Sequence, residues 1–331
     1  MEALTLTAVK APLELIHRPS LTPAADEVVV QLKAAALNRR DYWITQGMYP
    51  GIEPPVVLGS DGAGVVSQTG SDMENFWEGR QVIFNPGLDW GEDSRAQSAG
   101  FTILGLPRDG TFASEVAVPA SLLHAKPEHL DWHQASALPL GGITAWRAVF
   151  TQGDLKPGET VLITGIGGGV ATLALQFAMA AGADVWVTSS SSEKIARAVE
   201  LGAKGGFDYR SDDWAKQISK EAAPDLIIDS AGGVGYRSLI NVAAAGGRIV
   251  NYGATAGTPD KVDLFKVFWN QLRLQGTTMG SPDDFAAMVK FVEEKKIVPI
   301  VDSVLPLEKG NEALERMARA EQFGKLVLEI D

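Results

Sequence analysis

The stretch Val161-Leu-Ile-Thr-Gly165-Ile-Gly-Gly168-Gly-Val-Ala171 contains the pattern that decides the fold. Its apolar start, Val161 to Thr164, predicts a buried strand of a parallel sheet. Four glycines follow within five residues, and the segment after them carries apolar side chains at helical spacing. Strand, glycine turn and helix in this order are typical of a βαβ unit that binds a dinucleotide, because the glycines let a pyrophosphate approach the helix N-terminus.

The small residues of this turn follow the spacing Gly165-x-x-Gly168-x-x-Ala171, which differs from the plain Gly-x-Gly-x-x-Gly pattern. A second strand is expected at 184–188, one helix later. An ordinary glycine-rich loop of another α/β protein is the alternative, and the flanking strand and helix favour the nucleotide unit. The residues expected to contact the cofactor in this turn are Gly165, Gly168, Gly169 and Val170.

Length and composition indicate a globular chain with two domains. The chain has 331 residues, of which 45% are hydrophobic and 21% charged, and it contains no cysteine. Disulfides, cysteine-ligated zinc and a catalytic thiol are therefore excluded. The net charge of −12 comes without a block of Lys or Arg, which argues against nucleic acid and anionic membranes as partners. We find no membrane span and no signal peptide, and we expect a cytoplasmic protein.

The first part of the chain is rich in predicted strands. Short strands are expected at 28–33, 62–66, 79–84 and 113–118, with Gly and Pro between them and a long irregular stretch at 85–111. This spacing predicts a barrel-like β domain.

From about residue 130 the pattern changes to alternating strands and helices. A helical segment at 135–150 is followed by strands predicted at 161–164, 184–188, 204–208, 226–229 and 248–252, and by helices at 170–181, 193–201, 211–221 and 234–244. This alternation predicts a doubly wound sheet of six strands, with 272–278 as an edge strand.

A tail of about fifty residues follows, with helices expected at 282–295 and 314–320 and a strand at 326–330. Because so short a tail does not easily form a domain, we expect it to return to the first one. The predicted domains are 1–122 with 280–331, and 123–279.

Several segments in order carry a resemblance to a known family. They are Ala36-Leu-Asn38-Arg-Arg-Asp41, Leu58-Gly59-Ser-Asp61-Gly-Ala-Gly-Val-Val66, Leu138-Pro-Leu-Gly-Gly-Ile-Thr144, the turn 165–171, Asp229-Ser-Ala-Gly-Gly and Gly324-Lys-Leu-Val-Leu. The chain resembles the medium-chain dehydrogenase/reductases, and within them the zinc-free quinone oxidoreductase branch. The resemblance covers nearly the whole chain and implies a GroES-like β-barrel catalytic domain beside a Rossmann cofactor domain.

The positions of zinc ligands are changed in this chain. Zinc-dependent relatives read Gly-His-Glu where this sequence has Gly59-Ser60-Asp61, and their cysteine is replaced by Asn38. A further ligand position falls near Leu140, which cannot bind a metal. We therefore expect no metal site.

The second strand of the nucleotide unit runs into Thr188-Ser-Ser-Ser-Ser-Glu-Lys194 rather than into the acidic residue that usually holds the ribose of NAD. Hydroxyls and a lysine suit a 2′-phosphate, which predicts NADP(H). The alternatives are that one serine only caps a helix, and that Glu193 holds the ribose. The resemblance implies cofactor contacts at Thr144, Ser189, Ser190, Lys194, Tyr209, Ser230, Tyr252, Gly253 and Lys325.

Metal-free hydride transfer to a quinone or enone requires a hydrogen-bond donor for the oxygen that gains negative charge. Asn38 can donate without being charged, and a structural, turn-forming role is its alternative. Tyr42 or Tyr49 could supply the proton, as could solvent. Asp41 is expected to hold the local structure through hydrogen bonds. Trp43 and Tyr49 could stack on the ring of the substrate, but aromatic side chains more often belong to the hydrophobic core.

The expected function is that of an NADPH-dependent, metal-free reductase of a small-molecule quinone or α,β-unsaturated carbonyl, acting as a homodimer. The alternative is a nucleotide-binding sensor or structural protein with little catalysis, because a fold does not by itself imply activity.

Overall fold

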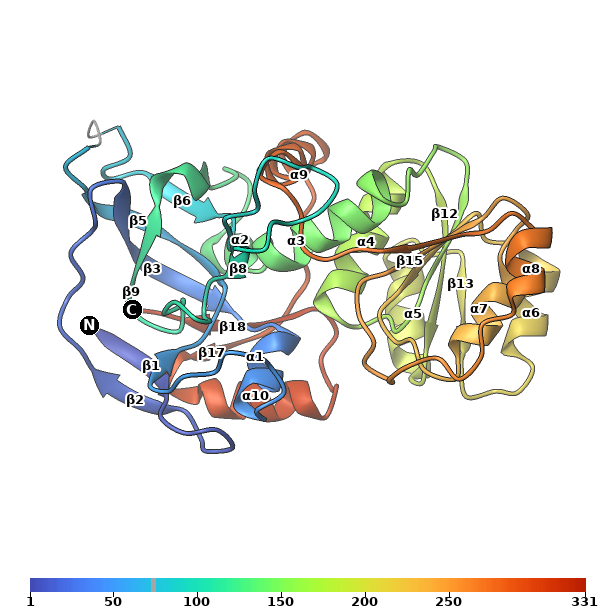
Figure 1. Cartoon of the computed structure of the whole chain (residues 1–331), viewed down its shortest axis with the longest axis horizontal. Helices are drawn as coiled ribbons and strands as arrows, with labels where there is room; N and C mark the ends of the chain where they lie inside the picture. Colours follow the sequence, from blue (N-terminus) through green and yellow to red (C-terminus); the bar gives the residue numbers. More distant parts are fainter. Residues whose placement is uncertain (73–75) are drawn as a thin grey trace. The chain divides into compact units, whose positions relative to one another are not determined.

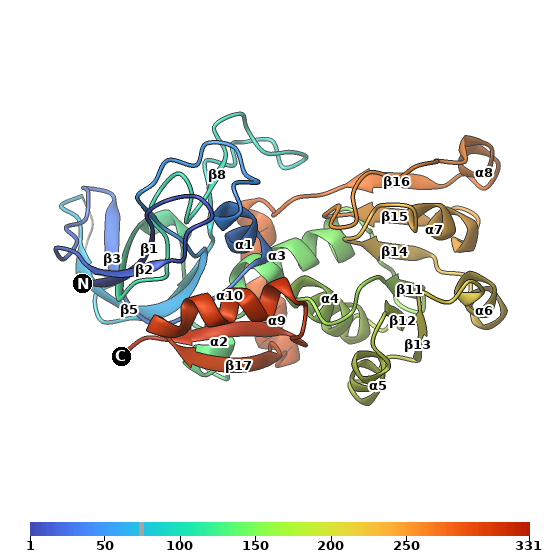
Figure 2. The same cartoon turned by 90° about the horizontal axis from the view of Figure 1, so that it is seen from below.

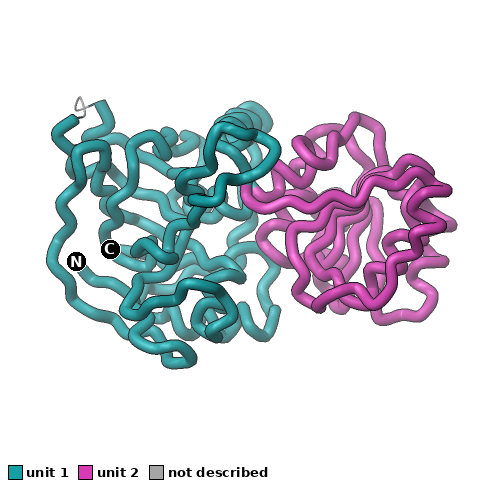
Figure 3. Tube along the Cα trace, viewed as in Figure 1, with its two compact units in different colours: residues 1–143, 280–331 teal, residues 144–279 magenta. Residues whose placement is uncertain are grey.

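The computed structural model describes residues 1–72 and 76–331. They form two compact units, Met1–Ile143 with Gly280–Asp331, and Thr144–Met279 (Figure 3). The second unit thus begins later than the expected boundary at residue 123. The segment before Thr144 packs with the first unit because strand β10 (Leu123–Ala125) pairs with β6 (Gln81–Phe84), and the Leu140 amide donates to Asp61.

The first unit is built on strand β3 (Glu27–Ala36), which pairs with three other strands. The large sheet has the order β10-β6-β5-β3-β18-β17, and β9 also pairs with β3. Its remaining strands are β5 (Asp61–Thr69), β9 (Glu115–Pro119), β17 (Val301–Pro306) and β18 (Lys325–Glu329). The tail of the chain therefore lies in the sheet of the N-terminal part, as Figure 1 shows.

Smaller elements complete this unit. A three-stranded sheet contains β2 (Glu14–His17), β1 (Glu2–Leu6) and β4 (Val56–Val57), and the long stretch after residue 85 contains only the short pair β7 (Gly87–Leu88) and β8 (Thr102–Ile103). The helices are α1 (Arg39–Thr45), α2 (Trp132–Ser136), α3 (Pro139–Trp146, extending past the unit's boundary), α9 (Pro282–Lys295) and α10 (Gly310–Ala318), with short 3-10 turns at Ala120–Leu122 and Leu307–Lys309.

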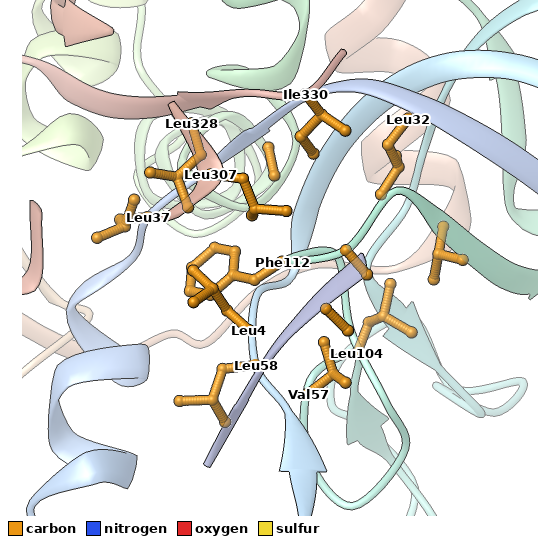
Figure 4. Close-up of a cluster of buried hydrophobic side chains, with 14 of the residues drawn as sticks. Leu4, Leu32, Leu37, Val57, Leu58, Leu104, Phe112, Leu307, Leu328 and Ile330 are labelled. Carbon is orange, nitrogen blue, oxygen red and sulfur yellow. The ribbon is translucent and has the colours of Figure 1, made fainter. Parts of the chain in front are cut away.

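One hydrophobic core joins distant parts of this unit. Figure 4 shows Leu4 and Phe112 packed near Leu328 and Leu307, so the first strand, the middle of the chain and the tail share one core. The tail cannot leave this unit without exposing these side chains, and burying a leucine is worth about 1.5–3 kcal/mol.

The second unit is the expected doubly wound fold. Its six strands are all parallel in the order β13-β12-β11-β14-β15-β16. They are β11 (Thr160–Ile163), β12 (Asp184–Ser189), β13 (Gly205–Asp208), β14 (Leu226–Asp229), β15 (Arg248–Asn251) and the edge strand β16 (Arg273–Gly276). The predicted sheet and its edge strand are confirmed.

The helices of this unit are α4 (Gly169–Ala180), α5 (Ser192–Glu200), α6 (Trp214–Glu221), α7 (Tyr236–Val242) and α8 (Leu264–Trp269), after a π-helical turn at Arg147–Thr151. Helix α4 packs on β11 and β12, and α5 packs on β12 and β13 (Figure 2). Buried side chains on α4, such as Leu173 and Phe177, explain why its sequence is almost entirely apolar. No described helix is long and apolar enough to cross a membrane.

Candidate active site

Three strands of the first unit bring together residues that are far apart in sequence. Asp61 at the start of β5 pairs with Ala36 at the end of β3, and the Leu37 amide donates to the carbonyl of Leu326 on β18. Asn38, Asp61 and Lys325 therefore meet at the point where these strand ends converge.

These three side chains form a closed set of hydrogen bonds. The Lys325 ammonium donates to Asn38 Oδ1 at 2.7 Å and to Asp61 Oδ2 at 2.8 Å, and Asn38 Nδ2 donates to Asp61 Oδ2 at 2.9 Å. All three are buried, with exposed fractions of 8% for Asn38, 0% for Asp61 and 4% for Lys325.

A second buried cation lies on the same elements. Arg40 donates to Ser60 Oγ at 2.8 Å and to the Leu104 carbonyl, and Ser60 Oγ also donates to that carbonyl. Gly59, just before Ser60, has a φ of +95°, and a Cβ there would lie 2.5 Å from Phe112, so only glycine fits the turn. The residues of this group, called the barrel cluster below, are Asn38, Arg40, Asp41, Ser60, Asp61 and Lys325.

Asp41 has the structural role expected of it. It is the third residue of α1, and its Oδ2 accepts from the backbone amide of Asn38, the N-cap, at 2.7 Å. Burial raises the pKa of Asp41 to about 6, although the charge of Arg40, the bond from Asn38 and the charge of Lys325 act in the opposite direction. Its Oδ1 is buried and has no hydrogen-bond partner among the residues that the structure describes.

The barrel cluster does not fit a zinc ion. Of the four changed ligand positions only Asp61 offers a carboxylate, and both of its oxygens already accept hydrogen bonds, Oδ1 from the Leu140 amide. The Asp61 carboxylate already faces the Lys325 ammonium at 2.8 Å, so it is not a free ligand for a metal ion. Among residues 1–72 and 76–331, no group of three or more His, Cys, Asp or Glu could hold a metal.

The two tyrosines proposed as proton donors follow the cluster in sequence. Tyr42 on α1 is partly buried against the hydrophobic core, and its ring lies 5.2 Å from that of Trp43. Tyr49 is 37% exposed, with the Arg40 guanidinium 5.5 Å from its ring centre. Tyr49 is thus the more accessible of the two.

In the second unit, the glycine turn has the geometry of an anion site. Gly168 is the N-cap of α4 and provides no capping side chain, so the first amides of this helix, at Gly169 and Val170, have no side-chain cap. A Cβ at Gly168 would meet no atom within 4 Å, so the space beside this N-cap is open. Gly165 has a φ of +64°, as the turn requires. These residues fit a pyrophosphate.

A second buried carboxylate joins the ends of three strands beside this turn. Asp229 Oδ1 accepts from Thr164 Oγ1 at 2.6 Å, and its Oδ2 accepts from the Gly232 amide and from Asn251 Nδ2, both at 2.9 Å. Tyr236 donates its hydroxyl to Asn251 Oδ1 at 2.8 Å. The residues of this group, called the sheet-edge cluster below, are Thr164, Asp229, Tyr236 and Asn251.

The other expected cofactor residues of this unit lie beside these strands. A Cβ on Gly165 would lie 3.7 Å from Ser230 Oγ, and a Cβ on Gly253 would lie 3.0 Å from the Ser230 carbonyl. Burial raises the pKa of Tyr252 to about 12, so it remains a hydroxyl. Thr144 is buried and directs its hydroxyl to the sulfur of Met279.

Two of the residues expected around a 2′-phosphate, Ser189 and Tyr209, lie on neighbouring strand ends. The Tyr209 amide donates to the Ser189 carbonyl at 3.3 Å, which joins the ends of β12 and β13. Ser191 is the N-cap of α5 and accepts from the Lys194 amide, so one serine of the run does cap the helix. Ser190 and Lys194 are half-buried, and Glu193 is exposed.

Two buried cations of the barrel cluster have contacts that the sequence did not indicate: Arg40 was assigned no role, and the bonds of Lys325 to Asn38 and Asp61 were not expected. Lys325 was expected at the cofactor, but both of its side-chain hydrogen bonds are with the barrel residues Asn38 and Asp61. A lysine inside the apolar run Gly324-Lys-Leu-Val-Leu was the available signal, because a buried lysine needs a buried partner. Asp61, in a glycine-rich strand, was the corresponding indication of a buried acidic partner for this lysine.

Comparisons with known proteins agree with this fold. Residues 24–128 match the family model of the alcohol dehydrogenase GroES-like domain, and residues 169–294 match the model of the zinc-binding dehydrogenases. A protein of Leptosphaeria maculans named zinc-type alcohol dehydrogenase-like protein YogA is 36% identical over 96% of this chain and 94% of its own length.

Two solved structures are also similar. A crystal structure described as an NAD-dependent alcohol dehydrogenase has a TM-score of 0.94 and 36% identity, with 100% of both chains covered. The 2-octenoyl-CoA carboxylase reductase CinF, solved with NADP and 2-octenoyl-CoA, has a TM-score of 0.90 and 25% identity, covering 99% of this chain and 87% of CinF.

The GroES-like unit and the Rossmann unit with its open glycine turn define an oxidoreductase of the type that uses a nicotinamide cofactor. The chain belongs to the medium-chain dehydrogenase/reductase family.

Proposed function

We propose that this enzyme reduces a quinone or an α,β-unsaturated carbonyl without a metal ion, using NADPH. The observation that carries the proposal is the barrel cluster, because Asn38, Ser60 and Asp61 stand at the positions of zinc ligands and are hydrogen-bonded to one another or to the two buried cations Lys325 and Arg40. The zinc-free branch of the family is therefore part of the same proposal.

The chain's own groups suit reduction better than alcohol oxidation. NADPH, when bound, supplies the hydride that reaches the electron-poor carbon of the substrate. Negative charge then grows on the carbonyl oxygen, where the amide of Asn38 donates a hydrogen bond. Tyr42, Tyr49 or water supplies the proton. Alcohol oxidation would require removal of a hydroxyl proton, which a metal ion makes easier by coordination and for which this cluster offers no metal ligands.

NADPH is supported by the end of β12. Ser189 at the end of β12 accepts from the Tyr209 amide, and Ser190 and Lys194 follow it in the segment where NAD-binding domains usually have an acidic residue for the ribose. The names of similar proteins divide on this point, since one structure is described as NAD-dependent and another was solved with NADP. Lys194→Ala should weaken NADPH by about tenfold to a hundredfold and leave NADH almost unchanged. Equal weakening of both would show that Lys194 is structural.

Steady-state rates test the reaction class. We expect chelator-treated enzyme to reduce a quinone or an enone with NADPH and to leave a primary alcohol unoxidised with NADP⁺. Asn38→Ala should lower kcat/KM by roughly tenfold to a thousandfold, the range for a lost oxyanion donor or less. Fast alcohol oxidation, or bound zinc whose removal abolishes activity, would refute the proposal. NADPH binding without turnover of any compound of the panel would favour the nucleotide-binding sensor or structural protein.

We also propose that the enzyme is a homodimer formed through the edge of the Rossmann sheet. Among the strands of residues 1–72 and 76–331, β16 pairs with β15 alone, and α8 before it exposes Leu264, Phe265, Phe268 and Trp269, at 61–71% each. A second copy related by a two-fold axis can pair β16 with itself and cover these rings. Phe268→Ser/Trp269→Ser should convert the dimer to a monomer in analytical ultracentrifugation, and a wild type that sediments as a monomer would refute it.

A further inference from the structure

The side chain of Asn38 lies between two groups of opposite charge that have different hydrogen-bonding abilities. Its Oδ1 accepts from Lys325 Nζ at 2.7 Å, and its Nδ2 donates to Asp61 Oδ2 at 2.9 Å. An ammonium can only donate and an ionised carboxylate can only accept. The carboxamide can therefore satisfy both neighbours in one orientation only, and turning it over would place oxygen against carboxylate and NH₂ against ammonium.

This orientation leaves one hydrogen of Asn38 Nδ2 without an acceptor among the described residues. The backbone amide of Asn38 is already bound to Asp41, so the side-chain hydrogen is the free donor of this residue. Asn38 is the substrate-oxygen donor under the proposed function, and the following inference rests on that role.

We propose that Lys325 and Asp61 are positioning residues, whose opposite charges hold the Asn38 carboxamide with its free N–H available to the substrate oxygen. The pair acts through Asn38 and does not itself touch the substrate. A donor held in place before the reaction costs no reorganisation when charge develops, which is the condition for strong stabilisation of an oxyanion.

The surroundings of the pair hold both charges in place. Asp61 receives the Leu140 amide on Oδ1 at 2.7 Å, and its backbone carbonyl accepts from Thr111 Oγ1 at 2.8 Å. Lys325 begins β18, and its own amide donates to the Ile300 carbonyl at 2.9 Å. Each charge is therefore anchored by elements other than α1, which carries Asn38 at its N-cap.

A role in stability alone does not account for this arrangement. A buried ion pair often contributes no more to stability than apolar side chains of the same volume. The ion pair distinguishes the oxygen of the Asn38 carboxamide from its NH₂ group, because one charge only donates and the other only accepts hydrogen bonds. Apolar neighbours would not distinguish them. Because Lys325 and Asp61 together favour one orientation of the Asn38 carboxamide, we describe them as positioning residues.

The test compares variants that remove both charges together, so that no unpaired buried charge is left. In Lys325→Met/Asp61→Asn, the carboxamide introduced by the second substitution can keep the Leu140 bond through its oxygen, and its NH₂ then favours the reversed Asn38 carboxamide. We expect kcat for an enone or quinone to fall about tenfold to a hundredfold, with the Kd for NADPH changed less than about threefold because the side-chain bonds of Lys325 go to Asn38 and Asp61. Adding Asn38→Ala to this variant should lower kcat less than about twofold further, since its donor is already lost.

A second variant covers the case in which the first does not fold. Lys325→Gln/Asp61→Asn surrounds Asn38 with amides that both donate and accept, so both orientations become possible and an intermediate loss of kcat is expected. The matched control is Arg316→Met/Asp302→Asn, which removes a partly buried pair of the same unit, joined at 3.0 Å, without touching Asn38. Its kcat should equal that of the wild type.

A spectroscopic readout does not require turnover. In a ¹H–¹⁵N spectrum, the side-chain NH₂ signal of Asn38 is identified as the pair of peaks that disappears in Asn38→Ala. The two proton chemical shifts of this NH₂ group should change in both variants that replace Lys325 and Asp61, and should not change in the control. Unchanged shifts, or rate losses that simply multiply with that of Asn38→Ala, would overturn the positioning role. A wild type with no reductase activity, whose Asn38 signal still responds to the variants, would refute the proposed function and leave the positioning of Asn38 in place.

Discussion

The barrel cluster and the sheet-edge cluster both surround a buried carboxylate, but they satisfy it in different ways. Asp61 in the barrel cluster faces the Lys325 ammonium at 2.8 Å, whereas the described donors to Asp229 in the sheet-edge cluster are all neutral, namely Thr164, Asn251 and backbone amides. The barrel cluster is charge-balanced, because it contains two cations and two carboxylates. The sheet-edge cluster contains a single carboxylate, which neutral hydrogen-bond donors stabilise.

This difference separates two tasks. Neutral donors from three strand ends fix the backbone next to the glycine turn, where a rigid frame for a phosphate is required. Opposite charges in the barrel cluster fix the orientation of one amide. We therefore expect the barrel cluster to be the more sensitive of the two to loss of a single group, because one change there leaves a charge without its partner.

The largest effect is expected for Lys325→Met. Asp61 is completely buried, so removal of the ammonium should destabilise the barrel unit by roughly 3–5 kcal/mol. Urea unfolding measures the loss, and Lys325→Met/Asp61→Asn should recover most of it. Arg316→Met, whose arginine is 30% exposed, should cost only about 1 kcal/mol. A Lys325→Met loss as small as this control would contradict the charge-balanced description.

Asp229→Asn is expected to have the next largest effect. The asparagine can still accept two hydrogen bonds through its oxygen, but its NH₂ would face two of the donors that now bind the carboxylate. Two buried donors without acceptors should cost roughly 2–3 kcal/mol. We expect lower stability of the Rossmann unit in urea and weaker NADPH binding by calorimetry, while the Asn38 signal stays unchanged. A loss larger than that of Lys325→Met would reverse the comparison.

Asp41 of the barrel cluster should make the stability of the protein respond to pH in the neutral range. Burial raises the pKa of Asp41 to about 6, whereas the raised pKa values of Tyr236 and Tyr252 lie at about 12. A folded pKa above the unfolded value of 3.8 means that the folded state holds the proton more tightly, so this contribution is present at low pH and is lost as the pH rises through 6.

The corresponding measurement compares the wild type with Asp41→Asn. The free energy of unfolding of the wild type, relative to the variant, should fall by about 2 kcal/mol between about pH 4.5 and pH 7.5, since one pKa unit corresponds to about 1.4 kcal/mol. The variant keeps an oxygen for the Asn38 amide and has no titration. A relative stability that is constant or rises with pH would contradict the raised pKa.

Most of the Rossmann unit could be predicted from the sequence, because its strands and helices are local patterns. The run before Gly165 and the apolar segment after Gly168 correspond closely to β11 and α4. Helix α1 was not predicted, although Asn38 and Asp41 have the spacing of a capping box. Strand β17, Val301–Pro306, was also missed, since its residues are mostly half-buried and give no clear alternation.

The candidate site could be predicted only in part, since its key contacts are not local. Asn38 was identified from its place in a motif, but the bond from Lys325 spans 287 positions along the chain and depends on the pairing of β18 with β3. Local spacing contains no information on such a contact. A buried charge predicts that a partner exists, without identifying it.

Thr164→Val should have the smallest effect and tests whether the sheet-edge cluster centres on its carboxylate. The hydroxyl of Thr164 donates to Asp229 Oδ1 at 2.6 Å, but Oδ1 also accepts from the Ala231 amide, and Oδ2 keeps its two donors. Valine has the same branched shape and suits the end of a strand, so no cavity or strain is expected. The loss of stability should therefore be about 1 kcal/mol, which is the contribution of one hydrogen bond whose acceptor keeps other partners.

Urea unfolding of Thr164→Val, Asp229→Asn and the double variant measures this loss. We expect the double variant to be at most about 0.5 kcal/mol less stable than Asp229→Asn. If Thr164→Val lowers the stability as much as Asp229→Asn, the hydroxyl rather than the carboxylate holds the strand ends together. The two clusters would then not both be centred on a buried carboxylate.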